Sequence, residues 1–248
     1  MRKTVCCILL LVCMSIAIPA CAEDVVVNGR DIAFSSETGI PYVNSDYRTM
    51  VPVRVITENL GADVSWSEPE QMVTVTTLEH TAQFFVGKDY MLVDGVKVQM
   101  DTEAVERGGR TYLPIRYVAD AIDCEVMWFA YREKAIIMDR AYYSKYTEFR
   151  DMFTYKATLP EHSEFAVVNA TTTKRIKYDD MKSYWNSLGS EDKEFFATMA
   201  TMEYQEANPE CPVSIAYIYH NKGNGKKHYL AAASTFSYDV HCFEPFKE

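Results

Sequence analysis

The stretch Arg48-Thr49-Met50-Val51-Pro52-Val53-Arg54, which runs on to Val64-Ser65-Trp66, decides the fold, because the chain contains it twice. The second copy is Arg110-Thr111-Tyr112-Leu113-Pro114-Ile115-Arg116, followed by Val126-Met127-Trp128. Each position of the first copy has its counterpart 62 residues later (48 to 110, 66 to 128). Arg, Thr, Pro, Arg, Val and Trp are identical in the two copies. The sequence therefore predicts a duplicated structural unit.

The residues around each copy predict its secondary structure. Asn28-Gly29 and Asp94-Gly95 separate short apolar runs, and such pairs favour hairpin turns because both residues tolerate positive φ. Pro52 and Pro114 suit the first turn of a helix, and apolar residues follow each of them at helical spacing. We predict a β-β-β-α-β-β order for each unit, with copies at about 25–78 and 82–140 and the sheet packed on short helices.

The repeated Arg, Pro and Trp residues are interpreted as a structural framework, since duplicated positions usually serve the repeated fold. We expect Arg54 and Arg116 to bond carboxylates or carbonyls, and Trp66 and Trp128 to be core anchors. Alternatively, the arginines bind an anion near a helix N-terminus and the tryptophans form a ligand platform. The framework set is Arg48, Pro52, Arg54, Trp66, Arg110, Pro114, Arg116 and Trp128.

The first 22 residues predict a secretory signal peptide that is cleaved after Ala22. Arg2 and Lys3 precede an apolar run, and Ala20-Cys21-Ala22 is a small-x-small site. The run is shorter than the roughly 20 residues of a membrane-spanning helix. A lipoprotein signal with Cys21 acylated is the alternative, and it would tether the protein. We expect a secreted or envelope-associated protein without a transmembrane helix in the mature chain.

Charge and cysteine content further limit the class of protein and its partners. The chain has 25 basic and 35 acidic residues, and removing Arg2 and Lys3 leaves a net charge of −12. Such a chain is repelled by nucleic acid, which excludes that partner class. Only Cys124, Cys211 and Cys242 remain after cleavage, so the mature chain is no disulfide scaffold. At 248 residues it has one or two domains.

Residues 25–140 resemble the copper amine oxidase-like N-terminal domain in their two Gly-containing hairpins, two Pro-x-Arg stretches and two tryptophans. The resemblance implies a small α+β module of secreted and cell-envelope proteins in Gram-positive bacteria. In the oxidases this module is a stalk remote from the catalytic core. It implies no cofactor here, because no two histidines form the His-x-His pair of the oxidase copper site. The mature chain has His80, His162, His220, His228 and His241.

Residues 141–248 match no pattern that we identify with a family. Helical spacing predicts helices over 179–188 and 190–205, and alternating apolar residues predict a C-terminal β-hairpin from 213–219 and 229–238. This part is expected to be a small α+β domain, so the chain divides into a signal peptide (1–22), the duplicated module (23–140) and a C-terminal domain (141–248).

Two groups in the C-terminal domain are candidate sites. His220 and His228 flank the hairpin turn and could bind Zn or Cu together with His241 and Cys242, although the spacing matches no compact ligand motif. Exposed strand-end histidines are the alternative. Cys211 and Cys242 lie just outside the two hairpin strands, so they could form a disulfide in an exported protein.

No nucleophile motif of the Gly-x-Ser-x-Gly type and no His-Glu-x-x-His motif occurs. The sequence therefore favours an exported, non-catalytic envelope protein whose stalk-type module supports a C-terminal interaction domain. Its partner at the cell surface or wall, protein or polysaccharide, is not specified. An envelope hydrolase with its site in the C-terminal domain and a metal-binding protein are the alternatives.

Overall fold

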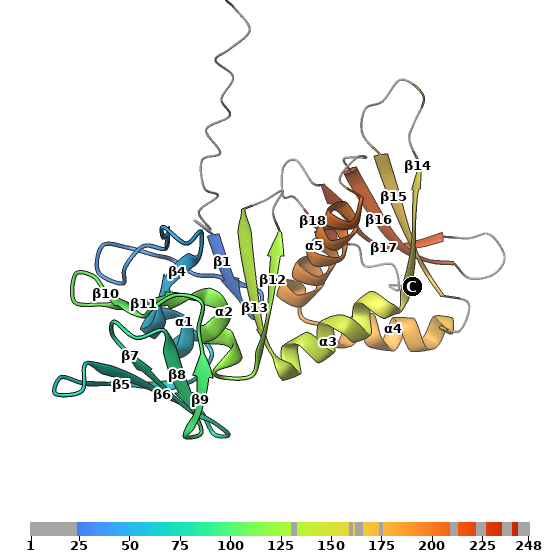
Figure 1. Cartoon of the computed structure of the whole chain (residues 1–248). Helices are drawn as coiled ribbons and strands as arrows, with labels where there is room; N and C mark the ends of the chain where they lie inside the picture. Colours follow the sequence, from blue (N-terminus) through green and yellow to red (C-terminus); the bar gives the residue numbers. More distant parts are fainter. Residues whose placement is uncertain are drawn as a thin grey trace, which may run out of the picture.

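The computed structural model describes residues 24–129, 133–158, 161, 166–173, 176–208, 213–221, 227–234 and 240–242 (Figure 1). These residues form an N-terminal module and a C-terminal domain that lie side by side. The architecture is mixed α+β, as the sequence predicts. The predicted signal peptide (1–22), Cys211, His162 and residues 222–226 of the predicted hairpin turn (221–227) lie outside the described residues.

The described residues of the module form three sheets and two short helices. The sheets have the strand orders β12-β13-β1-β2, β10-β11-β4-β3 and β5-β6-β7-β8-β9. The elements are β1 (Asp24–Val27), β2 (Arg30–Asp31), β3 (Tyr42–Val43), β4 (Thr49–Pro52), α1 (Val53–Asn59), β5 (Asp63–Ser67), β6 (Met72–Thr76), β7 (Thr81–Phe85), β8 (Tyr90–Val93), β9 (Val96–Gln99), β10 (Val105–Glu106), β11 (Thr111–Pro114), α2 (Ile115–Asp120), β12 (Cys124–Phe129) and β13 (Lys134–Asp139).

The repeated stretch supplies both a strand and a helix in each copy. Its first half forms β4 or β11, and these two strands pair antiparallel with Val51 opposite Leu113. Leu113 is the counterpart of Val51 at the 62-residue offset (51 to 113), so the pairing is symmetric between the copies. Pro52 and Pro114 end the strands and directly precede α1 and α2. The structure thus adds a strand to each predicted unit.

The two predicted hairpin turns are confirmed. Asn28 and Gly29 have φ values of 45° and 79°, and Asp94 and Gly95 have φ values of 51° and 79°. Two consecutive positive φ values allow a tight turn that matches the twist of the flanking strands. These turns join β1 to β2 and β8 to β9.

The first strand of the module lies beside its last strand. β1 pairs parallel with β13, with Val25 opposite Ala135 and Val27 opposite Ile137. These four side chains face the core of the module, in which Ile56 of α1 and Val118 of α2 are also buried. Residues alternate between the two faces of a strand, so the intervening residues of β1 and β13 face the C-terminal domain.

The described residues of the C-terminal domain form one five-stranded sheet and three helices. The strand order is β14-β15-β16-β17-β18, and the predicted pair of helices and the predicted hairpin are α4, α5 and β16-β17. Since β15 and β16 are parallel, α4 and α5 form the crossover between them. The elements are α3 (Arg140–Asp151), β14 (Phe153–Thr158), β15 (Ala166–Thr172), α4 (Tyr178–Ser187), α5 (Ser190–Ala207), β16 (Val213–Asn221), β17 (Lys227–Ser234) and β18 (Val240–Cys242).

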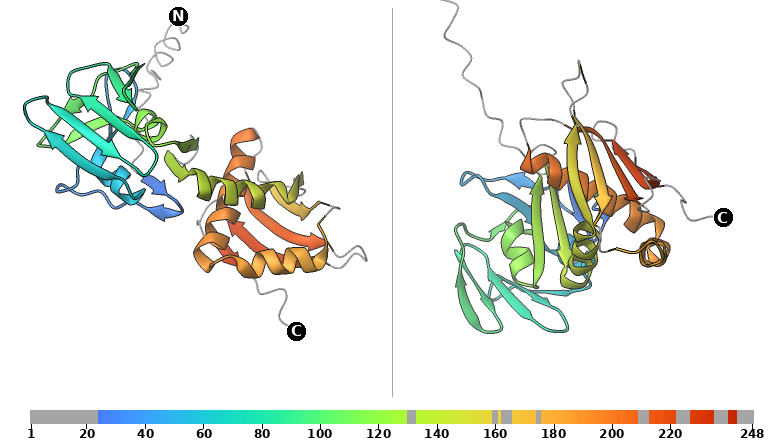
Figure 2. Two further views of the ribbon diagram at one scale, coloured as in Figure 1. Left: turned by 90° about the horizontal axis from the view of Figure 1, so that it is seen from below. Right: turned by 90° about the vertical axis from the view of Figure 1, so that its right-hand side faces the viewer.

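The helices of the C-terminal domain cover one face of its sheet (Figure 2). Its core is rich in aromatic rings: Phe149 packs 5.0 Å from Phe153 and 5.7 Å from Phe196, measured between ring centroids. Trp185 of α4 is 1% exposed in the same core. Val26 of β1 and Met138 of β13 also belong to this core. The sheet β12-β13-β1-β2 is therefore packed on both faces, with one core on each side.

Candidate functional site

Two grooves on the module each contain one of the repeated tryptophans. The first groove, about 680 Å³, is lined by Pro52, Arg54 and Trp66 of the first copy and by Arg110 and Thr111 of the second. The second groove, about 810 Å³, is lined by the counterparts of these residues: Pro114, Arg116 and Trp128 of the second copy and Arg48 and Thr49 of the first. Each groove therefore needs both copies, and all eight framework residues line one groove or the other.

The expectation that the tryptophans are core anchors is wrong. Trp66 is 38% exposed and Trp128 is 40% exposed. Val64 and Val126, two residues earlier on the same strand face, pack against the module core. β5 and β12 are edge strands of their sheets, so one side of each indole has no neighbouring strand. The repeated pattern identified these residues, but it could not show whether they face the core or a groove.

In the first groove, polar contacts hold the tryptophan by its edge. Trp66 Nε1 donates a hydrogen bond to Glu68 Oε2 at 2.7 Å. Arg54 Nη1 donates to Glu58 Oε1 at 3.1 Å and to the Val64 carbonyl oxygen at 3.3 Å. The indole N–H and the Arg54 guanidinium are thus engaged by groups of the protein.

The other arginine of the first groove comes from the second copy. Arg110 Nε donates to the Glu37 carbonyl oxygen at 2.8 Å, and Arg110 Nη1 donates to the Gly108 carbonyl oxygen at 2.6 Å. Glu37 belongs to the segment between β2 and β3, so this arginine connects distant parts of the module. Its contacts fix part of the lining of the first groove, to which Glu37 and Gly108 also belong.

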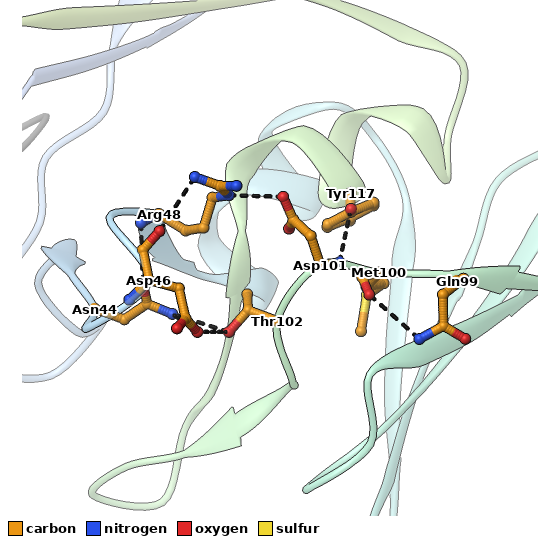
Figure 3. A network of polar contacts seen from close by, with 8 residues as sticks. All are labelled: Asn44, Asp46, Arg48, Gln99, Met100, Asp101, Thr102 and Tyr117. Atoms are coloured by element: carbon orange, nitrogen blue, oxygen red, sulfur yellow. Dashed lines mark hydrogen bonds and ion pairs between the residues drawn. The ribbon is translucent and has the colours of Figure 1, made fainter.

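In the second groove, Arg48 and Asp101 form an ion pair with 2.7 Å between Nε and Oδ2 (Figure 3). The Asp101 backbone N–H donates to Tyr117 Oη at 2.9 Å. Partial burial raises the pKa of the Asp101 carboxyl, but hydrogen bonds from Arg48 and Tyr117 and the nearby Arg116 lower it by more, so the pKa lies below its usual range. Asp101 is therefore an anion that holds Arg48 in the groove wall.

A side-chain network holds the loop before Arg48 in place (Figure 3). Asn44 Oδ1 accepts a hydrogen bond from the Arg48 backbone N–H at 2.9 Å, and Asn44 Nδ2 donates to Thr102 Oγ1 at 3.0 Å. Thr102 Oγ1 donates in turn to Asp46 Oδ2 at 2.7 Å. The loop is thus tied to the segment that carries Asp101.

Acidic residues outnumber the arginines in the lining of each groove. Each groove is lined by two arginines and four carboxylates, so each has a formal charge of −2. In the second groove, burial raises the pKa of Asp120, while Arg116 opposes the shift and Glu125 adds to it. The carboxylates are Glu37, Glu58, Glu68 and Glu106 in the first groove and Asp101, Asp120, Asp123 and Glu125 in the second.

The histidines of the C-terminal domain are brought together only in part. His220 lies opposite His228 across β16 and β17, and Tyr178 packs 5.6 Å from His220 and 5.0 Å from His228. His220 is 3% exposed, and its Nδ1 lies 2.9 Å from Thr172 Oγ1. It is therefore not the exposed strand-end histidine of the alternative interpretation.

The other two candidate ligands lie further along the sheet. His241 is paired with Ala232 and Cys242 with Ala231. Ala232 is four residues beyond His228 on β17, a separation of about 13 Å along a strand. The four candidates therefore do not meet at one point of the backbone. Because Cys211 lies outside the described residues, its disulfide with Cys242 stays a prediction.

A group of ligand-type residues that the sequence did not suggest lies on the module. Glu79, His80 and Asp123 place their ligand atoms within 4.8 Å of one another. His80 Nδ1 lies 2.8 Å from Asp94 Oδ2, and Asp123 forms an ion pair with Arg140. Asp94 thus holds one ring nitrogen of His80, and Arg140 competes for Asp123. The sequence separation between His80 and Asp123 hides this proximity.

Residues 26–137 match the family model of the copper amine oxidase N-terminal domain. The match confirms the resemblance found in the sequence. This domain is a non-catalytic, stalk-type module. The comparison with curated proteins gives no match to the chain. Among the described residues, no helix has both the length and the apolar character needed to cross a membrane.

Proposed function

We propose that the protein is an exported, non-catalytic protein of the cell envelope, in which the copper amine oxidase-type module supports the C-terminal domain as an interaction domain. One observation carries this proposal: Val26, Ile136 and Met138 of the module are buried in the same core as Tyr146 and Phe149 of α3. Domains that share a large apolar interface do not move freely relative to each other. The module therefore holds the C-terminal domain in a fixed orientation, as a support must.

Polar contacts beside the shared core add to this fixed orientation. Asp139, the last residue of β13, accepts a hydrogen bond from the Tyr142 backbone N–H at 2.8 Å and so caps α3. Asn28 Nδ2 donates to Asp139 Oδ2 at 2.6 Å, and the Asp139 N–H donates to Asn28 Oδ1 at 3.0 Å. Thus the first hairpin turn of the module is bonded to the residue that caps α3, the first helix of the C-terminal domain.

A second link joins α3 to α5 next to the same turn. Tyr142 Oη donates to Asp192 Oδ1 at 2.9 Å, and Lys145 forms an ion pair with Asp192. Burial, followed by the hydrogen bond to Asp192, raises the pKa of Tyr142, so its hydroxyl stays a donor throughout the physiological range. The start of α5 is thereby fixed relative to α3 and the module.

The export part of the proposal rests on residues 1–22, with their basic start, apolar run and small-x-small site. The mature chain, with a net charge of −12, suits a protein that stays in solution near an anionic surface. The partner of such a protein is a surface protein or polysaccharide.

Expression with the native leader in a Gram-positive host tests the proposal. We expect the protein outside the cytoplasm, with a mass-spectrometric N-terminus at Glu23. An acylated Cys21 at the N-terminus would mean export with a lipid tether. Full-length protein that starts at Met1 and stays in the cytoplasm would contradict export.

Metal binding is the second candidate function, because Glu79, His80 and Asp123 converge on one point. Asp94 already bonds Nδ1 of His80 and leaves Nε2 for an ion. Metal analysis after native purification tests it: stoichiometric Zn or Cu that is lost in His80→Ala would support the role, and metal-free protein would exclude it.

A further inference from the structure

We propose that the two grooves of the module are sugar-binding sites, each of which stacks one uncharged pyranose ring of a surface glycan on its tryptophan. The proposal starts from a contrast between buried and exposed repeated residues. Val51 and Leu113 are 0% exposed, so packing accounts for an apolar residue in both copies. Trp66 and Trp128 are 38% and 40% exposed, so packing does not account for a large indole at both places. A binding function of the exposed indole surface accounts for a tryptophan at both places.

The setting of the tryptophans points to stacking. The edge of Trp66 is held by its hydrogen bond to Glu68. A ring fixed at its edge presents a flat, rigid apolar face, and such a face gives contact area at little entropic cost. Each groove contains one tryptophan, which suits one flat ring rather than an extended apolar segment.

The polar groups around the tryptophans select the chemistry of the ligand. Arg54 is paired with Glu58, and Arg48 is paired with Asp101, so these guanidinium groups carry no uncompensated charge. With a formal charge of −2, both grooves repel anions, including phosphate polymers and nucleic acid. Carboxylates accept hydrogen bonds and guanidinium groups donate them. Neighbouring sugar hydroxyls, which do both, match this mixture without adding charge.

The volume of each groove fits part of a glycan chain. Volumes of about 680 and 810 Å³ lie in the range of small-ligand pockets. Since both grooves carry the equivalent Arg, Thr, Pro and Trp residues of the repeat, they bind equivalent units. One polymer with repeated units can occupy both grooves or link several protein molecules. This deepens the proposed function and rests on it in one respect, because a surface glycan is reached only after export.

The test uses the purified mature chain, residues 23–248, and the neutral β-1,4-linked hexamer of N-acetylglucosamine as the probe. In titration calorimetry we expect two sites per chain. Trp66→Ala and Trp128→Ala should each weaken binding at one site by at least about ten-fold, and the double variant should weaken it at both sites. Tyr229→Ala is the matched control, because Tyr229 is also 40% exposed but lies on β17 of the C-terminal domain. It should keep both sites.

Fluorescence of the wild-type chain provides a second readout that needs no variant. Trp185 is 1% exposed, so quenching by acrylamide reports on Trp66 and Trp128. The hexamer should protect these two indoles from quenching. Absence of both hexamer binding and protection would overturn the proposal.

A last binding experiment tests a cation as the alternative ligand. A tryptophan in an acidic groove also suits a quaternary ammonium group. Binding of choline that depends on the two tryptophans, without hexamer binding, would replace the sugar by a cation. Because all arms use purified protein, failure of sugar binding leaves export standing, and cytoplasmic retention of the protein would leave sugar binding intact.

Discussion

The two copies in the module share one framework but differ on the outward faces of their sheets. On β5 and β6 these faces carry hydroxyl side chains, whereas the equivalent positions of β12 and β13 are apolar. Phe129 is 2% exposed and Met138 is 0% exposed against the C-terminal domain. Four side chains thus decide which copy carries a domain. The pairs at the 62-residue offset are Ser65 and Met127, Ser67 and Phe129, Thr74 and Ile136, and Thr76 and Met138.

Exchanging one of these pairs should give the largest effect. Phe129→Ser removes a buried ring from the shared core and should lower the free energy of unfolding by about 4 kcal/mol. The reverse change, Ser67→Phe, adds a ring to a face without a covering domain and should change that energy by less than about 0.5 kcal/mol. Urea unfolding followed by near-ultraviolet circular dichroism measures both. Equal losses for the two variants would mean that the C-terminal domain does not depend on this face.

The two hairpin glycines give a second matched pair. Gly29 and Gly95 both have a φ of 79°. A Cβ at Gly29 would collide with Tyr142 of α3, whereas a Cβ at Gly95 meets nothing within 4 Å. Gly95→Ala should therefore cost about 1 kcal/mol of backbone strain. Gly29→Ala should cost about 1–3 kcal/mol more, because the domain contact must shift.

The same unfolding experiment compares these glycine variants. If Gly29→Ala were no more destabilising than Gly95→Ala, the hairpin turn would not touch the C-terminal domain in solution. Gly61→Ala is a control for strain alone, because Gly61 has a φ of 78° and open space around it.

The ends of the two copies differ as well. Asp139 caps α3, while its counterpart Thr77 (139 to 77) stabilises a turn by accepting the His80 N–H at 2.9 Å. Asp139→Ala should cost about 1–2 kcal/mol, because the cap and the bonds to Asn28 are lost together. Thr77→Ala should cost about half as much. Thermal unfolding ranks the two variants, and a larger loss for Thr77→Ala would contradict the role of Asp139.

The smallest effect concerns pH at the second hairpin. The hydrogen bond that His80 Nδ1–H donates to the Asp94 carboxylate and then the charge of Asp94 raise the pKa of His80, although slight desolvation opposes them. Asp94→Asn should therefore lower the pKa of His80, as measured by NMR titration of the imidazole. Glu79→Gln should lower it less, because Glu79 acts only through its charge. An unchanged pKa in Asp94→Asn would show that the two side chains do not interact.

The same pair has a defined pH dependence. Because the folded-state pKa of His80 lies above its unfolded value, the stabilisation is complete below the unfolded pKa and is lost as the pH rises through the folded pKa. The pKa of Asp94 is lowered, chiefly by the Thr81 backbone N–H, so its stabilisation is present above its unfolded pKa and is lost as the pH falls through the lowered value. The pair is therefore most stabilising between the unfolded pKa of Asp94 and the unfolded pKa of His80.

The sequence predicted those features that depend on local chemistry. Asn28-Gly29 and Asp94-Gly95 predicted both hairpins because positive φ restricts the choice of residue. The helical spacing of apolar residues after Gly189 predicted α5, because this spacing is also a local property of the sequence. The family match over residues 26–137 agrees with the repeated motif.

The features that the sequence did not predict depend on pairing between distant segments. The contact of β1 with β13 joins the two ends of the module, and nothing within either strand specifies it. Exposure of Trp66 and Trp128 follows from the edge positions of β5 and β12, which are set by the sheet orders. One signal was present in the sequence: a change from Thr74 to Ile136 at equivalent positions marks a face that becomes covered.

Calorimetry of residues 23–248 tests the central claim, that the C-terminal domain packs on a sheet of the module and that the two unfold as one body. With the sheet β12-β13-β1-β2 packed between both cores, heating should give a single transition whose calorimetric and van't Hoff enthalpies agree. Two resolved transitions, with the C-terminal one unchanged by Phe129→Ser, would contradict it.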